Sequence, residues 1–293
     1  MDDRDIVAAM KASALATMAG LAAAYDKYAT SLYSYCCWLV GDTEAAAAVV
    51  LETFRLALTD LRGIRNPDLL RSHLYAVARD ECRQRQQADS PADQDRPLAD
   101  HGRADLRGVI NTTLAELDRG EREVVELVFR HGLSQAGLGL VLGIPQRRAA
   151  TQAAKITGYL QERLAAPILA YTGAQTCPEL GELLPDWDGR LTLWVTGLVQ
   201  NHIAQCPTCK SLRYQAFQPA IVFALESSTN LPPSLRGQVI ALCLDSMGAE
   251  AGGGRAETAP PSARQARLGT MLAFAAIAIW VIAAVSITLL TVA

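Results

Sequence analysis

Apolar residues recur at helical spacing in two blocks of the chain, residues 21–82 and residues 110–164. Turn-forming residues at 41–42 and 66–68 divide the first block into three or four helices. The polar stretch between the two blocks has too few large apolar residues to build a core, which is typical of a linker. These patterns predict an all-α protein with a helical domain at 1–85, a linker at 86–105 and a second helical domain at 106–166.

Residues 268–293 contain no charged side chain. At about 1.5 Å per residue they are long enough to cross a bilayer core of roughly 30 Å, and a buried helix of a globular domain rarely runs this far without a polar face. We therefore predict one transmembrane helix at 268–293, joined through a Gly-, Pro- and Ala-rich linker at 249–267. Because Arg255, Arg264 and Arg267 precede the span, we expect a cell-membrane protein whose N-terminal bulk is cytoplasmic.

The composition agrees with a helical protein and limits the classes of function that we expect. Half of the 293 residues are hydrophobic but only 6% are aromatic, which favours helices with small interfaces over strand-rich folds. A net charge of −3 gives no overall attraction to nucleic acid, so DNA contacts require a local basic face. We find no Gly-rich phosphate loop, no Ser/His/Asp arrangement and no paired carboxylates in an apolar setting, so we expect no enzyme activity.

A candidate metal site lies after the second block. His202-Ile-Ala-Gln-Cys206-Pro-Thr-Cys209 places three ligands on one face of a helix or of a helix end. A helix at about 191–201 would bring in Cys177 as a fourth ligand, giving a closed, structural Zn²⁺ site of the Cys₃His type. In the alternative interpretation the cysteines are ordinary reduced residues and His202 lies on the surface. We assign residues 167–248 to this zinc-binding helical segment.

Motifs in the first block are similar to those of a known family. The stretch Tyr25-Asp-Lys-Tyr-Ala-Thr-Ser-Leu-Tyr, then Gly41-Asp42, Glu52-Thr-Phe54 and Leu70-Arg-Ser-His-Leu-Tyr-Ala-Val-Ala-Arg79 resemble region two of extracytoplasmic-function sigma factors. The resemblance implies a module that binds core RNA polymerase and opens promoter DNA. The implied polymerase contacts are Glu44, Glu52 and Phe54, and the implied phosphate contacts are Arg71, Arg79 and Arg83.

The first block also departs from the family. Ala45, Ala47 and Ala48 stand where the family usually has acidic residues or a glutamine in its polymerase-contacting helix. The basic residues have an alternative interpretation as a solvated face of a helix.

The second block has the pattern of a helix-turn-helix. Ser134 is suited to cap its first helix, residues 142–144 to form the turn, and Pro145 to lie in the first turn of the second helix. The block resembles region four of the same sigma family, although Gly137 and Gly139 replace a usual glutamate and alanine. The resemblance implies DNA contacts from the second helix through Gln146, Arg147, Arg148, Thr151, Gln152 and Lys155. The alternative is a helical scaffold that serves protein contacts.

The metal motif followed by a membrane span resembles the zinc-binding anti-sigma domain of bacteria, which clamps sigma modules. Together the resemblances imply a membrane-tethered sigma-like transcription regulator that is inhibited by its own zinc segment through an intramolecular contact. Its partners would then be core RNA polymerase, promoter DNA and the lipid bilayer. The alternative function is a degenerate sigma-like protein that acts as a docking or decoy partner for another sigma or anti-sigma factor.

Overall fold

The computed structural model describes residues 1–60, 63–88, 105–216 and 230–252. These residues are helical throughout, with no strand among them, so the predicted all-α class is confirmed. The chain divides into two compact units, residues 1–245 and 246–293. In the second unit the described part is the end of one helix.

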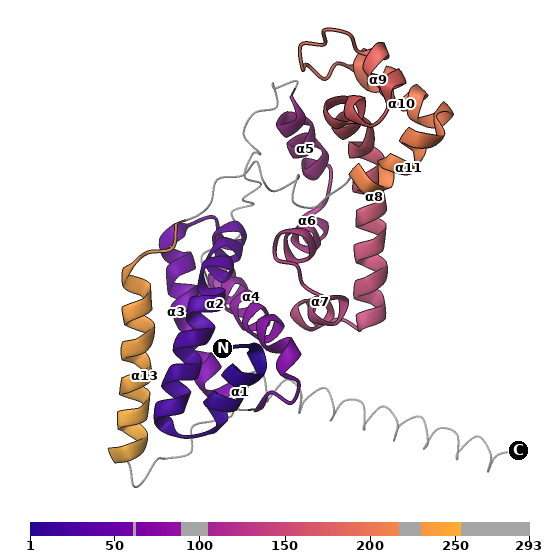
Figure 1. Cartoon of the computed structure of the whole chain (residues 1–293). Helices are drawn as coiled ribbons and strands as arrows, with labels where there is room; N and C mark the ends of the chain where they lie inside the picture. The colour runs from indigo at the N-terminus through magenta and orange to yellow at the C-terminus, as the bar shows by residue number, and fades with distance from the viewer. Residues whose placement is uncertain (61–62, 89–104, 217–229, 253–293) are drawn as a thin grey trace, which may run out of the picture. The chain divides into compact units, whose positions relative to one another are not determined.

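Four helices form the N-terminal helical group, residues 1–88 (Figure 1). They are α1 (Asp3–Lys11), α2 (Ala14–Val40), α3 (Thr43–Asp60) and α4 (Leu70–Ala88), with the 3-10 turn η2 (Pro67–Leu69) before α4. The expected turns are present, and α2 ends at Gly41 in the left-handed conformation. α1 lies before the periodic block, and it packs against α2 through Ile6, Val7 and Met10. α4 runs three residues beyond the expected boundary at 85.

The second group, which we call the helix-turn-helix group, spans residues 105–172. It contains α5 (Leu106–Ala115), α6 (Arg119–Val125), the π-helical stretch η3 (Glu126–Arg130), α7 (Gln135–Leu142) and α8 (Gln146–Thr172). Ser134 caps α7 as expected, because its Oγ accepts a hydrogen bond from the Gly137 N–H at 3.1 Å. α7 ends at Gly143 with φ 70°, and α8 begins one residue after Pro145, which is its N-cap.

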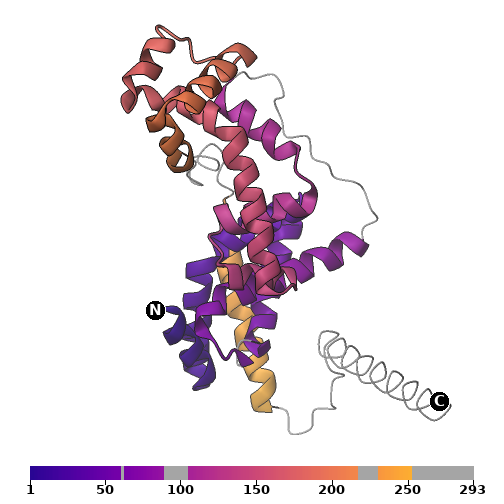
Figure 2. The same ribbon diagram turned by 90° about the vertical axis from the view of Figure 1, so that its right-hand side faces the viewer.

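The boundary expected at residue 166 lies inside α8. This helix continues through Pro167 to Thr172, and its last turns pack against the helices that follow. They are the 3-10 turn η4 (Gly173–Gln175), α9 (Pro178–Leu183), α10 (Leu193–Gln205) and α11 (Pro207–Ala216). Figures 1 and 2 show these helices gathered around the C-terminal end of α8. We call residues 173–216 the metal segment.

The helix α13 (Ser234–Gly252) contributes to a different core from the metal segment. Its residues Leu235 and Val239 are buried in the core that includes the N-terminal helical group. On the surface, the Arg236 guanidinium pairs with the Asp26 carboxylate of α2 at 2.7 Å. The part of the chain assigned to one zinc-binding segment therefore contacts two different groups of helices.

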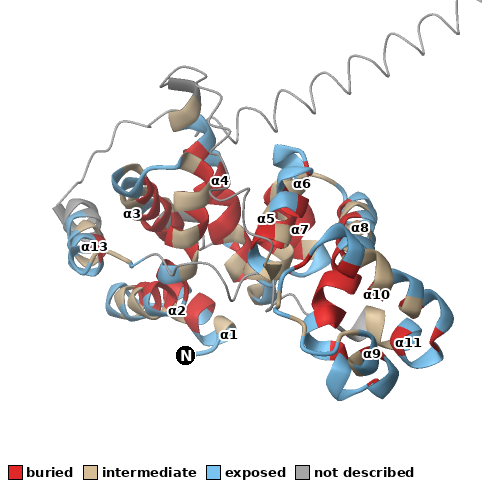
Figure 3. Ribbon diagram, turned by 90° about the horizontal axis from the view of Figure 1, so that it is seen from above, coloured by how far each residue is buried: buried red, intermediate tan, exposed pale blue. Residues whose placement is uncertain are grey.

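The buried residues, red in Figure 3, line the facing sides of the helices. They form two clusters. The larger cluster runs from α1–α4 into α5, α6 and α7 and along α8 as far as Ile168, so the two helical groups share one core. The smaller cluster joins the end of α8 to the metal segment. Among the described residues no helix is long and apolar enough to cross a membrane. The predicted span at 268–293 lies outside the described residues.

Candidate metal centre and DNA-contact residues

The four predicted metal ligands lie together in the metal segment. One ligand atom from each of Cys177, His202, Cys206 and Cys209 lies within 4.8 Å of all the others. The three cysteines are buried, and His202 is half-buried. This cluster could hold a metal ion.

The break between α10 and α11 places three of the ligands. His202 lies in the last turn of α10, and the Cys206 N–H closes that helix by donating to the His202 carbonyl at 2.8 Å. Cys206 itself is extended, and Pro207 then begins α11, as a proline in a first helical turn often does. Cys209 follows in the first turn of α11. The ligands therefore come from a helix end, a cap and a helix start.

The fourth ligand is positioned by a tight turn after α8. Cys177 precedes α9, and its N–H donates to the Gly173 carbonyl at 2.8 Å. A Cβ at Gly173 would lie 2.4 Å from Leu180 Cδ2, so a larger residue at this position would displace the Leu180 side chain. Leu180 is fully buried in the core beside the ligands. The turn at Gly173 therefore positions both a ligand of the metal cluster and a core residue of the metal segment.

The separations fit a tetrahedral metal ion with thiolate and imidazole ligands. Cys177 Sγ lies 3.4 Å from His202 Nε2 and 3.9 Å from Cys206 Sγ. In an ideal tetrahedron with Zn–S of about 2.3 Å and Zn–N of about 2.05 Å, the corresponding separations are about 3.6 and 3.8 Å. The agreement makes the cluster compatible with zinc.

The two cysteines of the Cys-Pro-Thr-Cys motif differ in acidity. The backbone N–H of Cys209 lowers the pKa of the Cys206 thiol, whereas burial and the neighbouring thiols raise the pKa of Cys209 to about 12. A cation at the centre of the cluster would stabilise the thiolate form of both residues. Four protein ligands leave no position for a reactive water, as in a structural site.

The residues expected to face DNA from the helix-turn-helix lie on the accessible side of α8. Its first turns expose the expected contacts Gln146, Arg147, Arg148, Thr151 and Lys155, while Gln152 is half-buried. Lys155 also pairs with the Glu121 carboxylate at 3.3 Å. These side chains share the start of one helix and are open to a ligand.

The arginines of α4 that were expected to contact phosphate have three different surroundings. Arg83 is exposed. Arg71 is half-buried, with its guanidinium 5.6 Å from the centre of the Tyr75 ring. Arg79 is 6% exposed and binds the Glu123 carboxylate through two nitrogens, at 2.5 and 2.9 Å. In this arrangement Arg79 is therefore closed to DNA.

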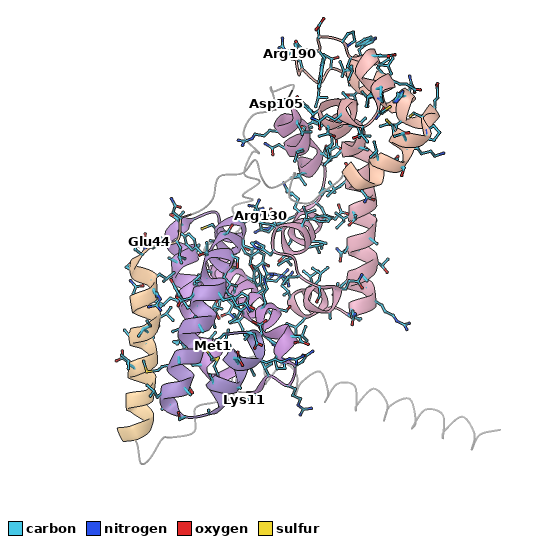
Figure 4. All side chains as sticks on the ribbon, in the orientation of Figure 1. Met1, Lys11, Glu44, Asp105, Arg130 and Arg190 are labelled. Atoms are coloured by element: carbon cyan, nitrogen blue, oxygen red, sulfur yellow. The ribbon has the colours of Figure 1, made fainter. Side chains whose placement is uncertain are left out.

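The expected polymerase contacts also differ in accessibility. Glu44 is exposed in the first turn of α3 (Figure 4). Glu52 is half-buried and bonds to Arg55. Phe54 is fully buried, with its ring centre 5.2 Å from that of Tyr25, so it belongs to the core in this structure.

The sequence pattern missed the polar residues that join the two helical groups. Tyr35, Glu123 and His131 are buried where α2, α4 and the helix-turn-helix group meet. The sequence signal for them is the run Glu-Val-Val-Glu-Leu-Val-Phe, in which the charged residues at 123 and 126 interrupt an apolar stretch.

No family model matches the chain, and no match was found among curated proteins or solved structures.

Proposed function

We propose that this protein is a membrane-tethered, sigma-like transcription regulator held inactive by the zinc-binding segment predicted at residues 167–248, which includes both the metal segment and most of α13. The observation that carries the proposal is that the chain after α8 contacts both helical groups. The metal segment shares a core with the end of α8, and α13 contributes Leu235 and Val239 to the core that includes the N-terminal helical group. One covalent chain thus contains the modules and the segments that restrain them.

Zinc has a structural role in this proposal. Cys177 and the motif of α10 and α11 come from both ends of the metal segment, so one ion ties its helices together. A structural zinc contributes directly to the folding free energy of the segment that it closes. Metal binding would therefore maintain the surface that the metal segment presents to α8.

Promoter DNA is the proposed ligand of the start of α8. Arg147, Arg148 and Lys155 concentrate positive charge there in a chain whose net charge is −3. Basic side chains at the start of a recognition helix supply phosphate contacts, and neighbouring polar side chains read base edges. Core RNA polymerase is the proposed partner of the N-terminal helical group, through the exposed Glu44 and the half-buried Glu52.

The membrane attachment is proposed from residues 268–293. An uncharged span of this length favours insertion in the bilayer, and the arginines before it favour a cytoplasmic location for the helical groups. Release from the membrane or from the restraining segments would then activate the regulator.

A cut between α11 and α13 tests the proposal. A protease recognition sequence inserted in residues 217–229 leaves α8 and the four ligands in one fragment. The full chain is compared before and after cleavage, with and without Leu235→Asp, which would place a charge in the buried contact of α13.

We expect the cleaved Leu235→Asp chain to bind core RNA polymerase and to start transcription at a promoter, while the uncut chain does neither. Absence of polymerase binding in every form would contradict the sigma role.

The alternative is a docking or decoy protein for another regulator. It is favoured by Ala45, Ala47 and Ala48, which replace acidic or amide side chains on α3, and by the burial of Arg79. Recovery of a separate sigma or anti-sigma factor, without polymerase subunits, in a pull-down with the full chain would support it.

A further inference from the structure

The two helical groups meet through a buried ion pair between α4 and α6. Arg79 Nε and Nη2 donate to the two carboxylate oxygens of Glu123, and Arg79 Nη1 donates to the Val141 carbonyl of α7 at 3.2 Å. Both side chains are almost completely covered. Each of the three nitrogens of this guanidinium therefore donates a hydrogen bond to the helix-turn-helix group.

A tyrosine from α2 completes the ion pair. The Tyr35 hydroxyl donates to Glu123 Oε1 at 2.8 Å. Burial raises the pKa of the Glu123 carboxyl, but the hydrogen bonds and charge of Arg79, with Tyr35, outweigh it and leave that pKa below its ordinary value. The carboxylate is thus ionised, and it accepts hydrogen bonds from two separate helices of the N-terminal helical group, α2 and α4.

The other buried polar groups at the junction between the two helical groups are less completely hydrogen-bonded. The His131 ring packs against Tyr35 and Tyr75, with ring centres 5.7 and 5.1 Å apart. Among the residues that the structure describes, no hydrogen-bond partner lies within reach of His131 Nε2, the Tyr75 hydroxyl or Arg71 Nε, all of which are buried. Buried polar atoms without partners reduce the stability of an interface. The junction therefore combines a strong centre with features that lower the cost of opening.

Glycine permits the close approach of the helices here. A Cβ at Gly137 of α7 would lie 2.2 Å from Ser72 Oγ and 3.3 Å from Ser72 Cβ of α4. The glycine that departs from the helix-turn-helix pattern thus has a packing role. Its place in α7 adapts this helix to α4.

We propose that the contact of α4 with α6 and α7 is an autoinhibitory latch, in which the Glu123 carboxylate occupies a guanidinium that binds nucleic-acid phosphate when the latch opens. The inference rests on the proposed function for its DNA ligand, and it adds a direct contact between the two helical groups to the restraint by the zinc segment.

The chemistry of the ion pair supports the replacement of the Glu123 carboxylate by a phosphate group on Arg79. A guanidinium binds carboxylate and phosphate through the same planar, two-pronged geometry. A buried ion pair contributes little net stability compared with well-packed apolar residues, because both charges lose their water. The pair of Arg79 and Glu123 is therefore suited to hold the two helical groups together and to be replaced by a pair of Arg79 with phosphate.

The opening of the latch is tested first without DNA. Glu123→Gln in the full chain removes the charge that holds Arg79, and Glu162→Gln removes a carboxylate from the exposed face of α8 as the control. We expect backbone amide exchange in α4 and α7 to quicken about tenfold in Glu123→Gln and to remain unchanged in Glu162→Gln. Equal exchange in both variants would overturn the latch.

The exposed guanidinium is tested with a mixed-sequence DNA duplex. We expect Glu123→Gln to bind the duplex about tenfold more tightly than Glu162→Gln at low salt. Its plot of log affinity against log salt should be steeper by about one, as expected for one more phosphate contact. Addition of Arg79→Gln should abolish both gains, and gains that persist in the double variant would overturn the role of Arg79.

A steric variant keeps the test valid if Glu123→Gln lacks a folded helical spectrum. Gly137→Val places a side chain against Ser72, while Gly158→Val has the same effect on helix propensity at a position with open space beyond its Cβ. We expect faster exchange in α4 and Arg79-dependent duplex binding for the first variant alone. Indistinguishable behaviour of the two valine variants would overturn the proposal.

The latch and the proposed function fail separately. Transcription with core polymerase tests the sigma role, whereas amide exchange and duplex binding test the latch without polymerase. A chain that opens and binds DNA through Arg79 but never binds polymerase would support the latch and contradict the sigma role.

Discussion

The metal cluster and the latch are both buried polar clusters, but they are assembled over different distances along the chain. The metal ligands lie within residues 177–209 and meet across one helix break and one turn. The latch joins Glu123 to Arg79 and Tyr35, which are 44 and 88 residues away in the sequence. The first cluster maintains a local fold, and the second sets the relation between two groups of helices.

Removing the metal should have the largest effect. Cys209→Ser deletes a buried ligand, and structural zinc sites contribute on the order of 10 kcal/mol to folding. We expect the zinc content of the purified full chain to fall from one ion to none, with loss of amide protection in α10 and α11. Cys37→Ser, at a cysteine outside the cluster, is the control. Retention of a full equivalent of zinc by Cys209→Ser would contradict the assignment of the ligands.

Breaking the latch by removing its cation should be the next largest effect. Arg79→Met leaves the Glu123 carboxylate buried without its partner, which costs about 3–5 kcal/mol in comparable sites. Urea unfolding would measure this loss, with Arg83→Met on the exposed side of α4 as the control. Equal free energies of unfolding for the two variants would show that the ion pair does not hold the groups together.

Acid should weaken the latch through His131. Burial first, then the charges of Arg130 and Arg71, lowers the pKa of His131 to about 3. Between this value and about 6.5, the unfolded chain binds a proton that the folded chain does not, so stability falls as pH decreases, by up to about 1.4 kcal/mol per pH unit.

Unfolding measured at pH 6.5 and 5.5 tests this effect. His131→Phe retains the ring packing against Tyr35 and Tyr75 and should show a smaller loss over the same interval. The comparison cancels the opposite contribution of Glu126, whose pKa is raised by burial. An equal loss in both proteins would assign the acid sensitivity to another group.

The exposed ion pair of α13 should have the smallest effect. Arg236 and Asp26 are both open to solvent, where ion pairs contribute little to stability. We expect Arg236→Gln to leave the thermal unfolding profile unchanged, while Leu235→Ala lowers the midpoint because it removes a buried side chain. A larger shift for Arg236→Gln than for Leu235→Ala would reverse this ranking.

The difference between local contacts, as in the metal cluster, and contacts between distant segments, as in the latch, explains which features could be predicted from the sequence. Helix positions follow from apolar periodicity, and the Ser134 cap and the turn at Gly143 follow from local residue preferences. The four residues of the candidate metal cluster were also predicted, from a short motif and one additional cysteine. The structure brings these residues together as the sequence predicted.

Contacts between distant segments were not accessible from the pattern. Arg79 and Arg83 have the same local character on one basic helix, yet one is buried by Glu123 and the other is exposed. Periodicity also placed a domain boundary at 166, inside α8, which continues through Pro167 to Thr172. Which side chain is covered depends on the neighbouring helix, and sequence spacing alone does not specify that neighbour.

The continuity of α8 has a mechanical consequence. At about 1.5 Å per residue, this helix forms a rod about 40 Å long, with the exposed basic side chains at its beginning and the metal segment around its end. Pro167 lacks the N–H that would bond to the preceding turn, which makes this position the natural pivot of the rod. Bending at Pro167 would therefore change the position of the metal segment while leaving the basic beginning of α8 straight.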